Sequence, residues 1–288
     1  MTVETAVRPR GPYVMALSCR LIGDATRTLQ EGRITAAVEG ADGPELAQSW
    51  QRPDGLVVLR AASEQGLEQL RFCLALDADH TEFLRRFGRD PLIGPTTRHL
   101  PGLRPVRTPT VAQALLRALC GQLILARDAR AIERRIVRAV MPAVGGTRLH
   151  AAPTTEALGA LSAARLRALG LHARRGATLL RICRSLDLDR LRAVPTAAAA
   201  ARIERERGLG PWSVGLVCLE GLGRPERGLA RDLGLVKLLS ALRGGARVDA
   251  EETDELLEPY GEWAGLASVY LLAGFSRGLV PLPARRAA

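Results

Sequence analysis

The spacing of apolar residues divides the chain into a mixed first part and a helical remainder. In the first part, residues 13–22, 34–39 and 56–61 are short apolar runs that predict strands, and glycine- and proline-containing turns separate them. Residues 64–76 carry apolar positions at helical spacing. The opening region is therefore predicted to be a small α+β unit.

A proline-rich segment, residues 101–109, separates this unit from the rest of the chain. Its three prolines are typical of a linker, so we expect one domain over 1–100 and a second over 101–288. In the second domain the pattern predicts only helices. Their expected ranges are 110–125, 127–140, 154–161, 162–170, 173–186, 196–207, 211–222, 233–242, 250–257 and 263–275.

The charge of the chain indicates an anionic partner. With 288 residues, 47% of them hydrophobic, the chain can bury a sizeable core, and its net charge is +11. A positive charge of this size attracts phosphate-rich surfaces, so nucleic acid is the leading candidate. Lys237 is the only lysine, and arginine, which supplies the other 40 of 41 basic residues, can donate two parallel hydrogen bonds to a phosphate.

Cysteine usage and hydropathy narrow the class of protein further. The cysteines show no C-x-x-C pair and no ligand cluster with the four histidines, so neither a zinc nor an iron–sulfur site is expected. They are expected to be buried thiols in a reducing cytoplasm, near the nucleoid. No apolar run approaches the roughly 20 residues that span a bilayer, so no membrane partner is expected. The cysteines are Cys19, Cys73, Cys120, Cys183 and Cys218.

Residues 204–219 hold the pattern that is most informative about function. A helix ends at Gly208, Leu209 and Gly210 follow, and Pro211 occupies the first turn of the next helix. Because neither glycine has a Cβ, the backbone N–H groups and the new helix N-terminus can receive a phosphate. Such a contact holds DNA without reading its bases. A tight helix–helix turn without a ligand would show the same glycines.

Asp232 stands 22 residues after Gly210, beyond one helix and a loop rich in glycine and proline. A helix is expected to begin at this position, where a carboxylate can act as an N-cap. The same carboxylate, placed beside a DNA-binding hairpin, can act in catalysis. The combination of hairpin, spacing and aspartate favours the catalytic role.

These residues resemble the helix-hairpin-helix superfamily of base-excision DNA glycosylases and, within it, the bacterial DNA-3-methyladenine glycosylase II group. The family pattern is L-x-G-I-G-P-W-T-A followed by G-R-P-D-x-F-P-x-x-D-L-G. Here residues 207–214 read RGLGPWSV and residues 223–234 read GRPERGLARDLG, with Glu226, Gly228 and Leu229 replacing the family's Asp, Phe and Pro. Further segments that resemble the family are 12–22, 118–123, 166–175 and 260–270.

The resemblance implies an α+β protein in which a small antiparallel β-sheet domain with helices precedes an all-α helix-hairpin-helix glycosylase domain. It implies a monofunctional DNA glycosylase of base excision repair, which flips alkylated bases such as 3-methyladenine out of damaged double-stranded DNA and excises them hydrolytically. Asp232 would stabilise the oxocarbenium-like transition state or orient the attacking water. A monomer without a cofactor is expected.

The same resemblance assigns roles to the other site residues. Trp212 would stack on the flipped base, while Leu123 would fill the gap in the duplex, although an ordinary core leucine is an equal alternative. No metal is required, but the backbone at Arg207 and Leu209 is a candidate site for a monovalent cation. The remaining pocket residues are Gln122, Leu216, Tyr270 and Leu272, and the DNA-backbone contacts are Gly208, Leu209, Gly210, Ser213, Arg174 and Arg175.

Strand cleavage after base removal requires an amine that forms a Schiff base with the sugar. In bifunctional relatives a lysine follows the hairpin glycines, and here Trp212 occupies that place. Lys237 lies five residues beyond Asp232, inside a predicted helix. We therefore expect no lyase activity.

Two other classes of function were compared with base excision. A non-catalytic protein that binds damaged DNA through the same hairpin is the main alternative, and Asp232 argues against it. A helical transcription regulator would need a polar recognition helix, and residues 211–222 are too apolar for one.

Overall fold

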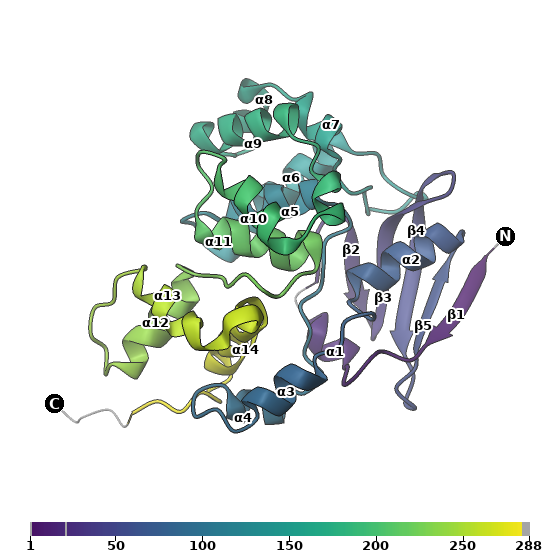
Figure 1. Ribbon diagram of the computed structural model, residues 1–288. Coiled ribbons are helices and arrows are strands. Elements are labelled where there is room, and N and C mark those ends of the chain that lie inside the picture. Colours follow the sequence, from purple (N-terminus) through teal and green to yellow (C-terminus); the bar gives the residue numbers. More distant parts are fainter. Residues whose placement is uncertain (1, 21, 284–288) are drawn as a thin grey trace.

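A computed structural model gives the fold and describes residues 2–20 and 22–283. A five-stranded sheet lies at one side of the molecule and helices make up the rest (Figure 1). All neighbouring strands are antiparallel, in the order β1-β5-β4-β3-β2. The α+β class with a small antiparallel sheet is thus confirmed. The strands are β1 (Val3–Val7), β2 (Arg27–Gln30), β3 (Arg33–Gly40), β4 (Gly43–Gln51) and β5 (Val57–Ala61).

Helix α2 (Glu64–Cys73) covers one face of the sheet (Figure 1). Ser63 caps it by accepting a hydrogen bond from the Gly66 N–H. Ile34 and Leu59 of the sheet and Leu70 of the helix belong to one buried cluster, each at most 1% exposed. The predicted strands at 34–39 and 56–61 and the predicted helix at 64–76 are confirmed.

The predicted strand at residues 13–22 is wrong. This segment contains the short helix α1 (Met15–Ser18), and β1 takes the edge position beside β5 instead. The Gln51 side chain holds the segment by accepting from the Met15 N–H (2.9 Å) and donating to the Tyr13 carbonyl (3.1 Å). The strands β1, β2 and β4 were not predicted, because pairing with neighbouring strands, rather than their own apolar pattern, makes them strands.

Two further helices precede residue 100, namely α3 (Thr81–Phe87) and α4 (Gly94–His99). They pack against the C-terminal helix α14 (Ala264–Ser276) rather than on the sheet, and the rings of Phe83 and Tyr270 lie 5.1 Å apart. The division into domains 1–100 and 101–288 remains a prediction.

The chain beyond residue 110 forms helices at the predicted places. Side-chain caps begin three of these helices, because the hydroxyls of Thr110, Thr154 and Ser162 each accept a backbone N–H three residues later. The α-helices are α5 (Val111–Gly121), α6 (Ala126–Val140), α7 (Thr155–Gly159), α8 (Ala163–Ala168), α9 (Ala173–Ser185), α10 (Thr196–Glu204), α11 (Pro211–Leu216), α12 (Leu233–Leu242), α13 (Glu252–Leu257) and α14. The 3₁₀ segments η1 (Asp189–Ala193) and η3 (Glu258–Trp263) and the π-helical η2 (Val217–Leu222) complete the set.

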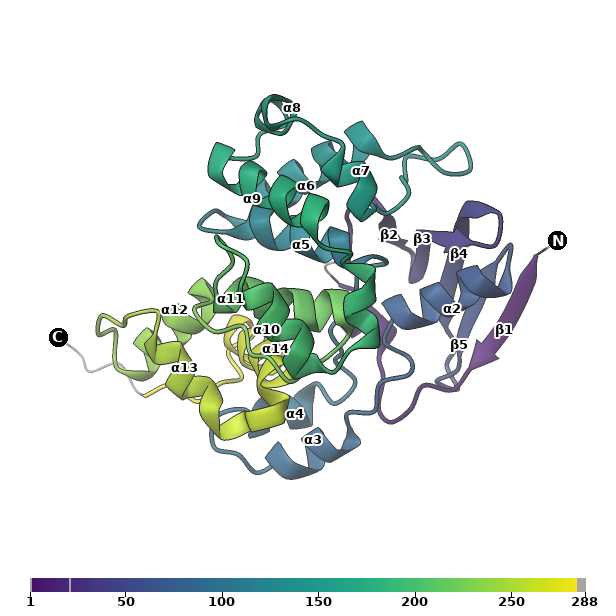
Figure 2. The same cartoon turned by 45° about the horizontal axis from the view of Figure 1, so that its top comes forward.

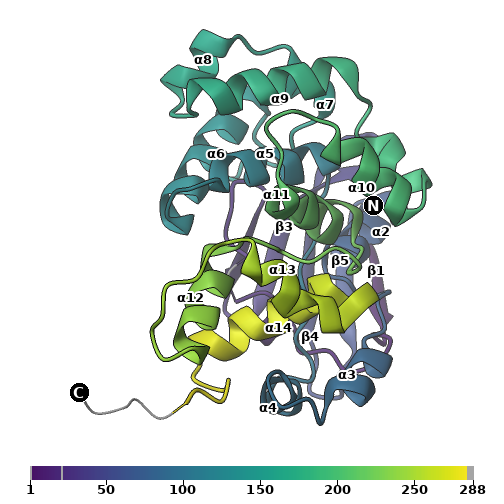
Figure 3. The same ribbon diagram turned by 60° about the vertical axis from the view of Figure 1, so that its left-hand side comes forward.

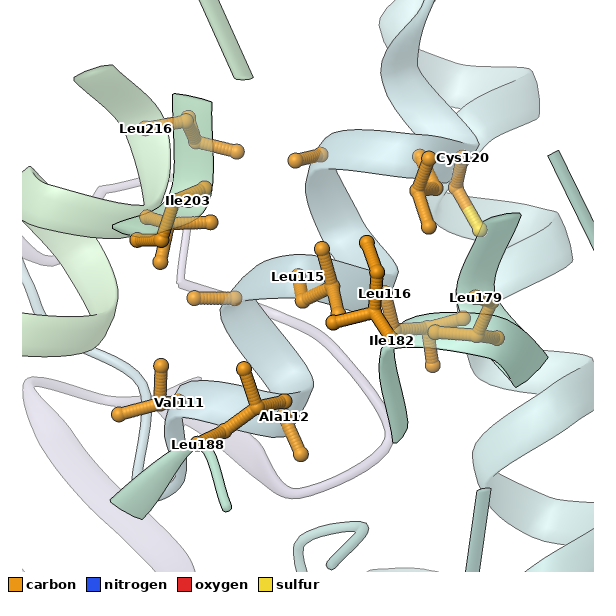
Figure 4. Close-up of a cluster of buried hydrophobic side chains, with 14 of the residues drawn as sticks. Val111, Ala112, Leu115, Leu116, Cys120, Leu179, Ile182, Leu188, Ile203 and Leu216 are labelled. Carbon is orange, nitrogen blue, oxygen red and sulfur yellow. The ribbon is translucent and has the colours of Figure 1, made fainter. Parts of the chain in front are cut away.

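Helix α5 is the centre of the largest buried cluster. Its Leu116 lies toward Ile182 and Leu179 of α9, while Ile203 of α10 and Leu216 of α11 lie on the other side of the helix (Figure 4). The cysteines are all buried free thiols, as expected. Among residues 2–20 and 22–283, no helix has both the length and the apolar character needed to cross a bilayer.

Helix α11 lies between two groups of helices, α5–α9 on one side and α12–α14 on the other (Figures 1 and 3). A view from another direction shows the same arrangement (Figure 2). The N-terminus of α11 follows the glycine hairpin, and the N-terminus of α12 carries Asp232. The fold thus brings the two predicted functional features to one region.

Candidate active site at the glycine hairpin

The hairpin between α10 and α11 has the predicted glycine geometry. Gly208 adopts φ +95°, a left-handed conformation that favours glycine, and an added Cβ would lie only 2.7 Å from Thr178 Oγ1. A Cβ added at Gly210 would meet nothing within 4 Å. Gly208 is therefore required by the turn, while Gly210 leaves the backbone open to an approaching ligand.

A buried carboxylate, Glu206, fixes the shape of the turn. It is 7% exposed and pairs with Arg181 and, at 2.5 Å, with Arg202. Burial opposes its ionisation, but the hydrogen bonds from both arginines hold the pKa of Glu206 below its ordinary value. The Glu206 carbonyl also accepts the Leu209 N–H (3.1 Å), so that N–H group is already used within the turn.

In the structure, the arginine side chain of Arg181 lies at the predicted cation site of the hairpin. The Arg207 carbonyl, one of its two proposed ligands, accepts a hydrogen bond from Arg181 Nη2 at 2.5 Å. A guanidinium on this oxygen repels a second cation. The structure therefore disfavours a monovalent ion at Arg207, and we do not propose one.

Gln122 connects the end of α5 to the hairpin. Its Nε2 donates to the Gly208 carbonyl (3.0 Å) and to Ser213 Oγ (3.1 Å). Ser213 is 1% exposed, so its hydroxyl faces Gln122 and not solvent. Because the whole residue is buried, a contact between Ser213 and DNA stays a prediction, and Gln122 links α5 to the hairpin in a way that the sequence did not reveal.

Trp212 and Asp232 form the central contact of the site. Trp212 Nε1 donates to Asp232 Oδ2 at 2.8 Å. The indole lies against Gly121, where an added Cβ would stand 2.7 Å from the ring atom Cη2. The other carboxylate oxygen, Oδ1, accepts the Gly234 N–H at 2.7 Å and caps α12. Asp232 is therefore the N-cap, and the same two bonds also orient it as a candidate catalytic group.

Hydrogen bonds to its backbone groups hold the loop at residues 223–231, although its sequence departs from the family pattern at Glu226, Gly228 and Leu229. The Gly265 N–H donates to the Pro225 carbonyl (2.7 Å), and the Leu229 N–H donates to Ser268 Oγ (3.0 Å). A Cβ at Gly215 would overlap the carbonyl oxygen of Gly228. The glycine at 215 thus lets two backbone segments approach closely, and this approach helps to fix the position of Asp232.

Of the other three predicted pocket residues, two leucines are compatible with a pocket and Tyr270 is a core residue. Leu272 lies beside the start of α12, since its Cδ2 would be 2.5 Å from a Cβ at Gly234, and Leu216 is buried at 7% exposure. Tyr270 is fully buried, and its hydroxyl donates to the carbonyls of Leu100 and Leu103 at 3.1 Å each. A hydroxyl satisfied in this way marks a packing residue, so we leave Tyr270 out of the pocket.

The predicted DNA-contacting side chains reach the surface to different degrees. Leu123 is 85% exposed in a left-handed conformation (φ +55°), so it is not a core leucine. Arg174 at the start of α9 is exposed and Arg175 is half-buried. Lys237 is exposed on α12, in the helix where it was expected.

Two cavities of similar volume occur in the structure. One, of about 220 Å³, has Pro211, Val214 and Gly228 in its wall, and the other, of about 230 Å³, has His80, Arg107 and Trp263. Neither is lined by Trp212 or Asp232. We assign the site from the hydrogen-bonded residues and not from these cavities, because the chemistry needs the carboxylate.

Comparisons with known proteins find several DNA glycosylases that resemble this chain. No protein-family model matches the chain. A DNA-3-methyladenine glycosylase from Bacillus subtilis is 27% identical over 206 residues, which cover 68% of this chain and 67% of that protein. The fold is similar to that of a 3-methyladenine DNA-glycosylase from Archaeoglobus fulgidus, with a TM-score of 0.82 at 20% identity over 94% of this chain and 98% of the other. It is also similar to an 8-oxoguanine glycosylase/lyase from Clostridium acetobutylicum in complex with double-stranded DNA (TM-score 0.77, 15% identity, 96% and 98% coverage).

Proposed function

We propose that this chain, a member of the helix-hairpin-helix DNA glycosylase superfamily related to DNA-3-methyladenine glycosylases, excises alkylated bases from duplex DNA by hydrolysis. The observation that carries the proposal is the 2.8 Å hydrogen bond from Trp212 to Asp232 at the glycine hairpin. It joins a flat aromatic side chain, suited to a flipped base, to a carboxylate suited to the sugar. Both stand beside a turn that can receive a phosphate.

The proposed reaction needs a single carboxylate. Extruding a base from the stack costs a few kcal/mol, and least where pairing is already damaged. Alkylation at a ring nitrogen makes the base cationic, so the glycosidic bond breaks without a separate general acid. Positive charge then develops on the sugar, and Asp232, held by Trp212 and Gly234, would stabilise it or orient the attacking water.

The proposed base pocket combines one aromatic wall with aliphatic side chains. Trp212 would stack on the flipped base through its ring, with Leu216 and Leu272 at positions where relatives carry aromatics. Gln122 would shape the pocket through its bonds to the hairpin. Around it, the DNA backbone would meet Gly208, Leu209, Gly210 and Ser213, together with Arg174 and Arg175. We propose that the protein acts as a monomer without a cofactor.

Release of bases from defined lesions tests this function. The protein is incubated with duplexes that each carry 3-methyladenine, 7-methylguanine, hypoxanthine or ethenoadenine, and alkali then converts abasic sites to strand breaks. We expect breaks at one or more of the lesions and none in undamaged duplex. If the protein binds the lesion duplexes but releases no base, the non-catalytic binder is the correct function.

Replacement of Trp212 tests the central contact. Trp212→Phe keeps an aromatic ring but removes the donor to Asp232 Oδ2, so the carboxylate is less firmly oriented. We expect the single-turnover rate of base release to fall about tenfold, the equivalent of one net hydrogen bond to a charged group. Trp263→Phe, at the start of α14, is the matched control and should leave the rate unchanged. Equal loss in both variants would contradict a specific role for Trp212.

Trapping with borohydride tests whether the enzyme also cleaves the strand. A Schiff base requires an amine at the sugar, whereas Trp212 takes the place of the lysine of bifunctional relatives and Lys237 is exposed on α12. We expect no covalent protein–DNA adduct when borohydride is added during base release. A trapped adduct that disappears in Lys237→Arg would show that the enzyme is bifunctional.

A further inference from the structure

The connection between α5 and α6 presents a second exposed leucine beside Leu123. Leu125 is 63% exposed, while Ile124 between them packs against the helical core. We call Leu123 and Leu125 together the leucine tip. Other large apolar side chains are less exposed, among them Leu233 at 55% and Leu282 at 45%.

Both leucines of the tip occur where the backbone favours a different residue. Leu123 adopts φ +55°, a left-handed conformation that costs a residue with a Cβ about 1 kcal/mol or more. Leu125 is the N-cap of α6 and supplies no side-chain hydrogen bond, whereas serine or aspartate there would stabilise a helix by about 1 kcal/mol. Departures from local preference of this kind concentrate at functional positions.

A hydrogen bond connects the leucine tip to the glycine hairpin. Gln122, the residue before Leu123, donates to the Gly208 carbonyl, and the side chain of Arg207 next to it is exposed. On the other side of the tip, Arg127 is 84% exposed and its ion pair with Asp128 is long, at 3.4 Å. Exposed apolar side chains flanked by arginines are complementary to a partner with an anionic surface and an apolar interior. Duplex DNA with an opened base stack has this character.

We propose that Leu125 is a second DNA-contacting residue, which packs on the unpaired base of the opposite strand while Leu123 fills the gap left by the flipped nucleotide. The Cα atoms of residues two apart in the chain lie at most about 7 Å from each other, so the two leucines can reach neighbouring positions in a duplex. This proposal rests on the proposed function, because only flipping creates both the gap and the unpaired base.

Binding to a duplex that mimics the product tests the role of Leu125. One strand carries a tetrahydrofuran abasic site and the opposite base is 2-aminopurine, whose fluorescence reports stacking. For Leu125→Ser we expect affinity for this duplex to fall about tenfold, as for loss of a buried leucine contact, and most of the fluorescence change to disappear. Affinity for an undamaged duplex should stay within about twofold, because phosphate contacts dominate there.

The choice of serine separates function from folding. Serine is a good N-cap, so Leu125→Ser should keep or raise the midpoint of thermal unfolding while it weakens binding. Leu125→Met should retain binding, and Leu282→Ser, the control at 45% exposure, should change neither property.

Three results would overturn the proposal. The first is unchanged affinity and fluorescence in Leu125→Ser, and the second is an equal loss of affinity for both duplexes, which would indicate a contact to the backbone only. The third is a change confined to the oligomeric state, which would assign the tip to contacts between protein copies. If the wild-type protein releases lesions normally in the same experiments, each of these failures concerns Leu125 and leaves the proposed function standing.

Discussion

Asp232→Asn should lower the single-turnover rate of base release by about 10²- to 10³-fold, as removal of one preorganised electrostatic group does in other enzymes. The substitution keeps the shape of the side chain, removes its charge and replaces one acceptor oxygen by an amide NH₂ group. Asparagine has one acceptor oxygen, so it can accept either the Trp212 indole N–H or the Gly234 N–H, which both now bind the carboxylate. The rate should therefore fall through loss of charge and of orientation together. The measurement is quenched-flow or manual sampling of alkali-labile sites with enzyme in excess.

Folding must be intact for this result to be interpreted. The lost hydrogen bond should cost about 1 kcal/mol of unfolding free energy, and asparagine remains a good N-cap for α12. Asp187→Asn removes an exposed carboxylate that pairs with Arg190 and serves as the matched control, with full activity expected. Activity of Asp232→Asn within twofold of the wild-type rate would refute the catalytic assignment.

The largest effect on stability should come from Arg117. This side chain binds Glu220 (2.6 Å), Asp24 (2.8 Å) and Glu133 (2.8 Å), and so joins η2, the segment before β2 and helix α6. The side chains of Asp24 and Glu133 are only 3% and 2% exposed. Burial opposes ionisation of Asp24, but Arg27 and Arg117 hold its pKa below the ordinary value, so it stays charged.

Arg117→Met should therefore lower the free energy of unfolding by about 3–5 kcal/mol, because it leaves buried carboxylates without their partner. Urea denaturation followed by circular dichroism measures the change. Arg127→Met is the control, since Arg127 is 84% exposed, and it should change the free energy of unfolding by less than about 0.5 kcal/mol. A similar small change in Arg117→Met would mean that the network does not stabilise the fold.

The sequence alone determined the features that depend on residues close to one another along the chain. Helices beyond residue 110 follow from apolar spacing and from caps such as Thr154 and Ser162, which act within one turn. The glycine turn follows from Gly208, whose left-handed conformation is a local requirement. The position of Asp232 at a helix start is local too, so its capping role was foreseen.

Tertiary structure decided which distant segments meet. β1 and β4 have weak apolar patterns of their own and become strands by pairing within the sheet, while residues 13–22 lose that position to β1. Tyr270 is an aromatic residue that the sequence analysis placed in the base pocket. It lies against Phe83 in the core instead, because α3 packs against α14. The hydrogen bond between Trp212 and Asp232 crosses 20 residues of chain, and its geometry depends on the close approach of Gly215 and Gly228. Short-range preferences specify turns and helix ends, but contacts across the fold depend on packing that no local pattern contains.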